Sequence, residues 1–147
     1  LAFEYITHTN YNPGATAAVW QRVMDKEKSQ PSSFQQFISD HPSDGDRRDA
    51  YVKKLYEYSN KHVTAKDGTV KVNGKDFVTP AASGDMSGAE RSYFVLGNLA
   101  AAYHNGHNKE KAYADGKTVM LGAQPIMTST YDDESATKLV DRLNQIK

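Results

Sequence analysis

Histidine, aspartate and glutamate are the residue types of this chain best suited to hold a metal or transfer a proton, since it contains no cysteine. Its 5 histidines form no HExxH or HxH pattern. Glu4 and His8 stand four residues apart and could share a metal or only interact at a helix surface. His104 and His107 are three apart, but Asn105-Gly106 is expected to end a helix between them. These residues alone predict no complete active site.

The other chemically capable residues are numerous but not arranged for catalysis. Asp44, Asp46 and Asp49 fall where a helix is expected to begin, and carboxylates there complement the helix dipole. Asp44-Gly45-Asp46 lacks the alternating ligands of a calcium loop. The 9 tyrosines could form a sugar-stacking face or act as amphipathic core residues. No glycine-rich phosphate loop and no Gly-x-Ser-x-Gly turn is present.

Composition limits the function classes further. The chain has 147 residues with 18 Lys+Arg against 18 Asp+Glu, so its formal net charge is +0. This balance argues against a basic nucleic-acid arm, and we expect no nucleic-acid partner. No apolar run approaches the roughly 18 residues of a membrane span. The absence of cysteine excludes disulfides and thiolate chemistry but leaves the compartment open.

The first 60 or so residues have the pattern of helices. Pro13 follows Asn12 as an N-terminal helix signal, and a helix is expected over about 14–28. Ser33 and Gln36 have the spacing of a capping box for a short helix that carries Phe34, Phe37 and Ile38. A third helix is expected from Ser43 to about Ser59.

The remainder of the chain changes period and contains two similar units. Residues 69–79 have the alternation of a β-hairpin around Asn73-Gly74, and a capping box of Ser87 and Glu90 opens a helix that ends near Asn105. Residues 117–128 predict a second hairpin, after a loop over 104–115. A final helix is expected to be capped by Asp132 or Asp133.

These elements predict an α+β fold with an internal duplication. We expect a helical segment over 1–61 and a duplicated hairpin–helix domain over 62–147, with units at about 66–106 and 115–147. Each unit contributes one two-stranded hairpin and one helix. The expected product is therefore a four-stranded, mostly antiparallel sheet with two helices.

The first segment also resembles a known family. Asn10-Tyr11-Asn12-Pro13, a helix ending in Val23-Met24, a serine-rich spacer, then His41-Pro42 and Arg47 are similar to the HtpX/BepA-type zinc metalloendopeptidases. In that family a "Gly-Tyr-(Asp/Asn)-Pro" turn follows the helix that bears a glutamate ligand, and a His-Pro motif with a later Arg follows. The likeness covers about residues 1–60, with Asn10 where the family has Gly.

The resemblance implies a parent enzyme whose zinc site lies outside this chain. The HExxH helix is absent, and the glutamate ligand would precede Leu1, so we expect a piece of a longer protein that is inactive alone and holds no zinc or other cofactor itself. His41 and Arg47 would then support catalysis near the zinc cleft, by binding the oxyanion or controlling access. The implied partners are the rest of the peptidase domain and a polypeptide substrate. The implied location is extracytoplasmic, in the cell envelope or secreted.

A second hypothesis requires no enzyme. The duplicated domain could be a non-catalytic module that binds a protein or a cell-wall polymer through a strand edge or a sheet surface. A self-contained hydrolase using His104 and His107 is a third class. Loss of a measured activity on substitution of His107 would be needed to support it.

Overall fold

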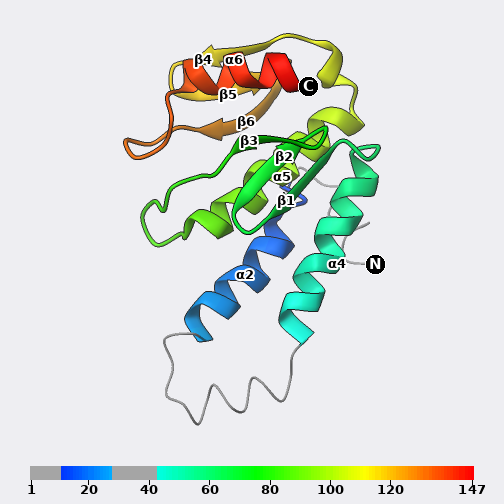
Figure 1. The fold of residues 1–147 in the computed structure, drawn as a ribbon, viewed down its shortest axis with the longest axis vertical. Helices are drawn as coiled ribbons and strands as arrows, with labels where there is room; N and C mark the ends of the chain where they lie inside the picture. The colour runs from blue at the N-terminus through cyan, green and yellow to red at the C-terminus, as the bar shows by residue number, and fades with distance from the viewer. Residues whose placement is uncertain (1–10, 28–42) are drawn as a thin grey trace.

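The computed structural model describes residues 11–27 and 43–147, which form an α+β fold of four α-helices, one short 3-10 helix and six strands. The helices at 15–27 and 43–58 extend below two small sheets, and the helix at 136–146 lies beside the second sheet (Figure 1). In chain order the elements are α2 (Ala15–Glu27), α4 (Ser43–Tyr58), β1 (Val63–Lys66), β2 (Thr69–Val72), β3 (Lys75–Val78), α5 (Gly88–His104), η1 (His107–Lys109), β4 (Ala112–Asp115), β5 (Thr118–Leu121), β6 (Gln124–Thr128) and α6 (Ala136–Ile146).

The α+β class is confirmed, but the predicted four-stranded sheet is wrong. Two separate three-stranded antiparallel sheets form instead, in the orders β1-β2-β3 and β4-β5-β6. Both sheets have a register irregularity at the corresponding point: opposite Val70-Lys71 the third strand has the extra residue Phe77, and opposite Val119-Met120 it has Ile126. The Thr69 and Thr79 hydroxyls lie 2.8 Å apart across the first sheet, and those of Thr118 and Thr128 lie 2.9 Å apart across the second. The two halves are thus built alike down to single side-chain contacts.

The prediction was wrong because it missed β1 and β4. Residues 63–66 resembled a polar linker and 112–115 the end of a loop, since the buried residues are only Val63 and Ala65 in β1 and only Ala112 in β4. Asp67-Gly68 is nevertheless a hairpin-turn pair, and the turn between β4 and β5 is Gly116-Lys117, with glycine at its first position. Asp67 and Gly68 both have positive φ, at 52° and 82°, as a type I′ turn requires. The turn signal was therefore present in the sequence, and the weak apolar alternation of the strands hid it.

The helices join the two sheets into one body. α5 packs on β1 and β2 of its own half and on β6 of the other half, whereas α6 packs on β4 and β5 and on β3 of the first half. Each helix thus crosses from its own sheet to the third strand of the other sheet. The shared core is apolar and fully enclosed, with its largest side chains at Phe77, Leu55, Leu96, Leu99, Leu121, Ile126, Leu139 and Leu143.

The helices α2 and α4 lie side by side and pack against α5 (Figure 1). The turn before α2 is fixed to α5 by Asn12, whose Nδ2 donates to the carbonyl of Phe94 at 2.9 Å and to Oδ1 of Asn98 at 3.1 Å. Gly14 and Gly97 lie at the crossing, and a Cβ on Gly97 would collide with the Gly14 backbone and the Asn12 side chain. The Asn-Pro-Gly segment therefore docks the helical pair on the rest of the fold.

Side-chain caps begin both helices of the second half of the chain. The Ser87 hydroxyl accepts from the Glu90 N–H at 3.1 Å, as the capping box predicts, while the Glu90 carboxylate turns to Arg22 at 2.8 Å. The last helix is capped by Ser135, which accepts from the Lys138 N–H at 3.3 Å. The expectation that Asp132 or Asp133 would cap it is wrong.

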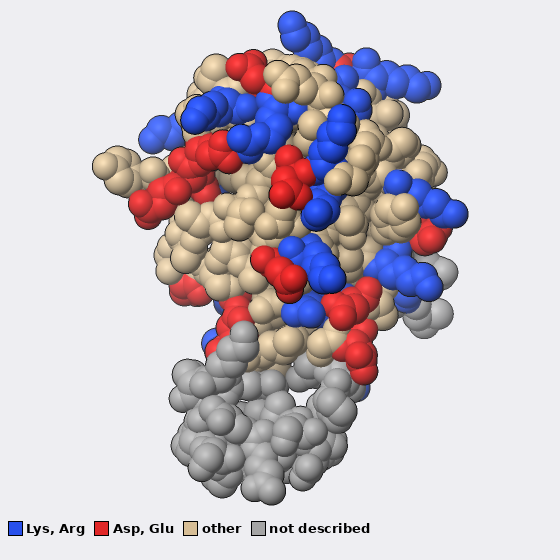
Figure 2. Space-filling view, viewed as in Figure 1, with Lys and Arg blue, Asp and Glu red and all other residues tan. Residues whose placement is uncertain are grey.

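The remaining sequence predictions concern a short helix, the surface charge and membrane-spanning segments. The short helix expected around Phe34 lies outside the described residues. Lysine and arginine are interspersed with aspartate and glutamate on the face shown in Figure 2, without a continuous stripe of one sign. Within residues 11–27 and 43–147, no helix combines the length and apolarity needed to cross a membrane.

Candidate functional site

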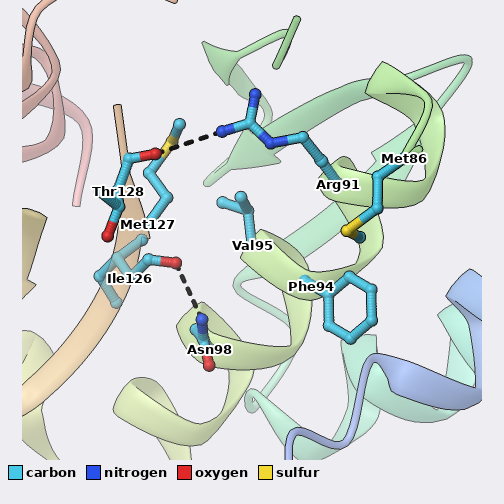
Figure 3. A pocket seen from close by; sticks show the side chains of 8 residues that line it. All are labelled: Met86, Arg91, Phe94, Val95, Asn98, Ile126, Met127 and Thr128. Atoms are coloured by element: carbon cyan, nitrogen blue, oxygen red, sulfur yellow. Dashed lines mark hydrogen bonds between the residues drawn. The ribbon is translucent and has the colours of Figure 1, made fainter. Parts of the chain in front are cut away.

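A groove of about 340 Å³ lies between α5 and β6. Its floor is formed by the buried side chains of Val95, Ile126 and Met127, and its walls by the half-buried Met86 and Phe94 (Figure 3). The sulfur-bearing side chains are flexible and polarizable, so they can adjust to occupants of different shape. A concave apolar surface of this size with a few polar groups is the usual form of a binding site.

The polar groups of the groove come from α5 and meet the outer edge of β6. Asn98 Nδ2 donates to the carbonyl of Ile126 at 2.9 Å, and Arg91 Nη2 donates to the carbonyl of Thr128 at 3.2 Å (Figure 3). Residues two apart in a strand point their backbone groups to the same side. The two carbonyls therefore face away from β5, along the edge of the sheet, and α5 covers them with side chains.

The edges at β3 and β4 are covered in a related way. Arg142 of α6 donates to the carbonyl of Phe77 on β3 at 2.8 Å, the position that corresponds to Ile126 on β6. The Asn144 side chain both accepts from the Ala112 N–H at 2.9 Å and donates to its carbonyl at 3.1 Å, as a neighbouring strand would. Covered edges protect against unwanted strand pairing. Only the β6 edge combines this cover with the groove described above.

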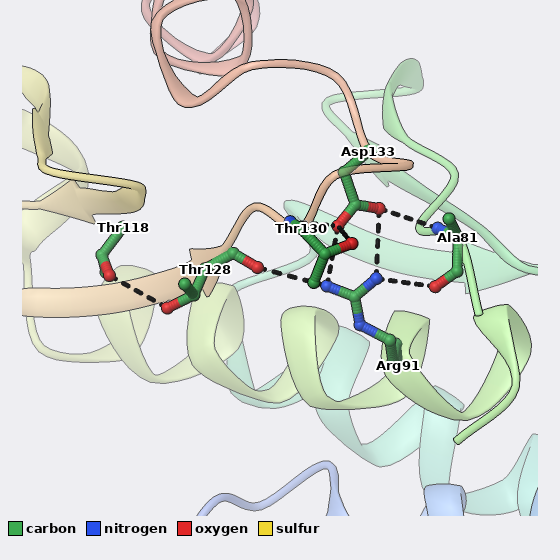
Figure 4. A network of polar contacts seen from close by, with 6 residues as sticks. All are labelled: Ala81, Arg91, Thr118, Thr128, Thr130 and Asp133. Carbon is green, nitrogen blue, oxygen red and sulfur yellow. Dashed lines mark hydrogen bonds and ion pairs between the residues drawn. The ribbon is translucent and has the colours of Figure 1, made fainter. Parts of the chain in front are cut away.

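Arg91 is the centre of a polar network beside the groove (Figure 4). Its guanidinium donates to the carbonyl of Ala81 at 2.6 Å and lies 2.9 Å from the carboxylate of Asp133, whose side chain is fully enclosed. Asp133 also accepts from the Ala81 N–H at 2.8 Å and from both the N–H and the hydroxyl of Thr130 at 2.9 Å. The network ties the loop before α5 and the loop before α6 to the same end of β6.

These contacts set the charge state of Asp133. Burial alone would raise the pKa of its carboxyl, but the hydrogen bonds from Arg91, Ala81 and Thr130 outweigh burial and lower the pKa from 3.8 to about 2. Asp133 is therefore ionised at neutral pH and holds Arg91 in place. No sequence pattern links these two residues, which are brought together only by the packing of α5 against the end of β6.

The structure gives the predicted catalytic residues no shared site. His41 lies outside the described residues, as do Glu4 and His8. Arg47 is exposed on α4, with its guanidinium carbon 4.9 Å from the ring centre of Trp20 on α2. This is a cation–π contact between the paired helices.

The histidines of the second half are also separate. The ring of His104 stacks on Tyr58 with centroids 3.9 Å apart, and His107 Nδ1 lies 3.3 Å from a carboxylate oxygen of Glu110. Across the described ranges, no three His, Asp or Glu side chains are grouped so as to hold a metal ion. The third hypothesis, which needs His104 and His107 to act together, gains no geometric support.

Comparison with known proteins identifies no similar protein. Searches against family models, curated proteins and solved structures give no match.

Proposed function

We propose that this chain acts as a non-catalytic interaction module that binds an extended polypeptide segment in the groove between α5 and β6. The observation that carries the proposal is the apolar groove running along an edge strand, with two strand carbonyls at its rim. An apolar side chain of the bound segment would fill the space over Val95 and Ile126. The hydrophobic effect would supply most of the binding free energy.

The strand edge is what favours a polypeptide over other occupants. A bound strand presents N–H groups at the same repeat as the carbonyls of Ile126 and Thr128. Each carbonyl oxygen has two lone pairs, so it can accept a second hydrogen bond while Asn98 or Arg91 keeps the first. Met86 and Met127 can rearrange around different side chains, which suits a site that accepts more than one sequence.

A fluorescently labelled hexapeptide that alternates valine with threonine tests this proposal by anisotropy. We expect saturable binding, weakened at least tenfold by Met86→Glu, which puts a carboxylate at the apolar wall. Met120→Glu, on a half-buried position of β5 that does not line the groove, is the matched control and should bind as the unaltered protein does. Absence of saturable binding, or equal weakening by both variants, would overturn the proposal.

A second candidate function is supported by the resemblance to the HtpX/BepA-type enzymes: the module would belong to a zinc metalloendopeptidase whose catalytic zinc is bound elsewhere in the parent. One structural observation favours it. Val19 on α2 is 55% exposed, and Val23, one turn later, is half-buried, so the described residues leave part of this helix face uncovered. We propose that the remaining peptidase domain packs on that face, and that a polypeptide substrate reaches the groove. An extracytoplasmic location, in the envelope or secreted, follows from the same likeness.

Sequencing the parent gene upstream of the codon for Leu1 tests this second candidate directly. The coding sequence before Leu1 is expected to encode HExxH, followed some tens of residues later by a glutamate segment that runs into Leu1. Arg47→Ala and His41→Ala in that full-length enzyme should then lower peptide cleavage without releasing zinc. An upstream sequence without HExxH contradicts the enzyme candidate and leaves the binding module unaffected.

A further inference from the structure

A second hollow, of about 500 Å³, lies on another part of the molecule, between α4 and the start of the first sheet. Lys53 and Tyr56 line it from α4, and Lys61, His62 and Thr64 line it from the turn after α4 and from β1. Its volume falls within the range of small-molecule sites. The groove proposed for a polypeptide shares none of these residues.

The ring of His62 is held in one orientation and one tautomer. Asn73 Nδ2 donates to the carbonyl of Ile146 at 2.8 Å, which places Asn73 Oδ1 toward the ring, 2.6 Å from His62 Nδ1. An amide oxygen only accepts, so Nδ1 carries the proton. The ring also stacks on the buried Tyr103, with centroids 4.7 Å apart. In the neutral ring, Nε2 is therefore the acceptor left for a ligand.

Lys61 has a backbone conformation that lysine rarely adopts. Its φ is 66°, and that of Asn60 is 58°, so both residues are left-handed. The turn is fixed by the Lys61 N–H donating to the Tyr56 carbonyl at 2.8 Å and by the Ser59 hydroxyl, which accepts from the N–H groups of His62 and Val63. Glycine adopts this conformation without strain. Backbone strain is concentrated at functional sites, so the strain at Lys61, at the rim of the hollow, favours a role for its side chain in binding.

The groups around the hollow suit an anion that also carries a hydroxyl. Lys53 and Lys61 supply two positive charges against the single negative charge of Asp49. Their ammonium groups donate hydrogen bonds to oxyanions. The Asp49 carboxylate is already paired with Arg48 Nε at 3.1 Å, so His62 Nε2 is the acceptor for which a hydroxyl group on the ligand would supply the donor.

We propose that this hollow binds a small hydroxylated oxyanion, with its charged oxygens on Lys53 and Lys61 and its hydroxyl on His62. Both 2-hydroxycarboxylates and hydrogen phosphate have this chemistry, since each combines an anionic oxygen with an O–H donor. The site adds small-ligand binding to the proposed polypeptide function and does not depend on that function.

Titrations of the full chain with lactate, inorganic phosphate and acetate, each at constant ionic strength in chloride, test the site by amide NMR shifts. We expect saturable shifts at Lys61, His62 and Thr64 with lactate or phosphate, and at least fivefold weaker binding of acetate, which lacks the hydroxyl. Tighter lactate than phosphate assigns a hydroxycarboxylate, and the reverse assigns a phosphate. Equal binding of lactate and acetate would overturn the role of His62.

Two variants separate binding from folding. Lys61→Gly together with Lys53→Gln should weaken binding at least tenfold, while Lys61→Gly alone should keep or raise the thermal midpoint because it removes the strain. Lys54→Gln is the matched control: its ammonium lies 5.4 Å from the ring centre of Tyr51, and it does not line the hollow. No saturable shift with either hydroxylated anion, or equal weakening by the control, would overturn the proposal.

Discussion

The enclosed ion pair between Arg91 and Asp133 should make a measurable part of the stability depend on pH. The folded pKa of Asp133 is about 2, and its ordinary value is 3.8. Because the folded value is the lower one, the ionised carboxylate stabilises the fold at pH values above about 4. That contribution is lost as the pH falls from about 4 through 2.

The size of the effect follows from the two pKa values. A difference of one pKa unit corresponds to about 1.4 kcal/mol, so the pH-dependent contribution of Asp133 to the unfolding free energy is about 2–3 kcal/mol. Asp133→Asn should cost more, about 3–5 kcal/mol at pH 7, because it leaves the Arg91 guanidinium enclosed without a counter-charge. The new amide N–H₂ would also oppose one of the N–H donors of Ala81 or Thr130.

Urea unfolding at pH 7, 4 and 2.5, followed by circular dichroism, measures this difference. The gap in unfolding free energy between the unaltered chain and Asp133→Asn should narrow by about 2 kcal/mol over that range. Asp132→Asn, at the exposed neighbouring position, is the control and should change stability by less than about 0.5 kcal/mol at each pH. A gap that stays constant with pH would refute the assignment of the low pKa to Asp133.

Four further substitutions test the packing and the strain described above. Gly97→Ala should destabilise by about 1–3 kcal/mol because its methyl group would collide with the α2 turn. Gly45→Ala should stabilise by up to about 1 kcal/mol, because among the described residues its Cβ would meet only Met24 Cε, at 3.8 Å. Urea unfolding should give opposite signs for the two changes, and equal signs would contradict the crossing geometry. Lys61→Gly should raise the unfolding free energy by about 1 kcal/mol by relieving a positive φ, and a clear loss of stability would refute the strain. Arg47→Ala should cost less than about 1 kcal/mol, the usual size of an exposed cation–π contact, and a larger loss in thermal unfolding would show that Arg47 has a further structural role.

Local signals explain which parts of the fold were predictable. The capping box at Ser87, the Asn73-Gly74 turn and the apolar periodicity of α5 each act within a few residues, and each predicts an element that the structure contains. β1 and β4 were missed because they carry little apolar alternation: the buried residues are Val63 and Ala65 in β1 and Ala112 alone in β4. The separation into two sheets depends on where α5 and α6 cross, which no local pattern encodes.

The groove and the ion pair could not be predicted for a similar reason. Asp133 looked like a helix cap because aspartate is common there, but Ser135 supplies the cap and Asp133 bonds Arg91, 42 residues away. The pairing of Asn98 with the Ile126 carbonyl also depends on tertiary contact alone. The Asn12-Pro13 turn, read from sequence as part of a peptidase-like pattern, contributes to packing by holding α2 on α5.

The most direct test of the proposed module is to locate the bound polypeptide by NMR, using the valine–threonine hexapeptide and the full chain. Binding in the groove predicts saturable changes in the side-chain signals of Asn98 Nδ2 and Arg91 Nε and in the Met86 methyl group. It also predicts intermolecular contacts from a peptide valine to Val95. Changes confined to other surfaces, or no saturable change at these groups, would contradict the account.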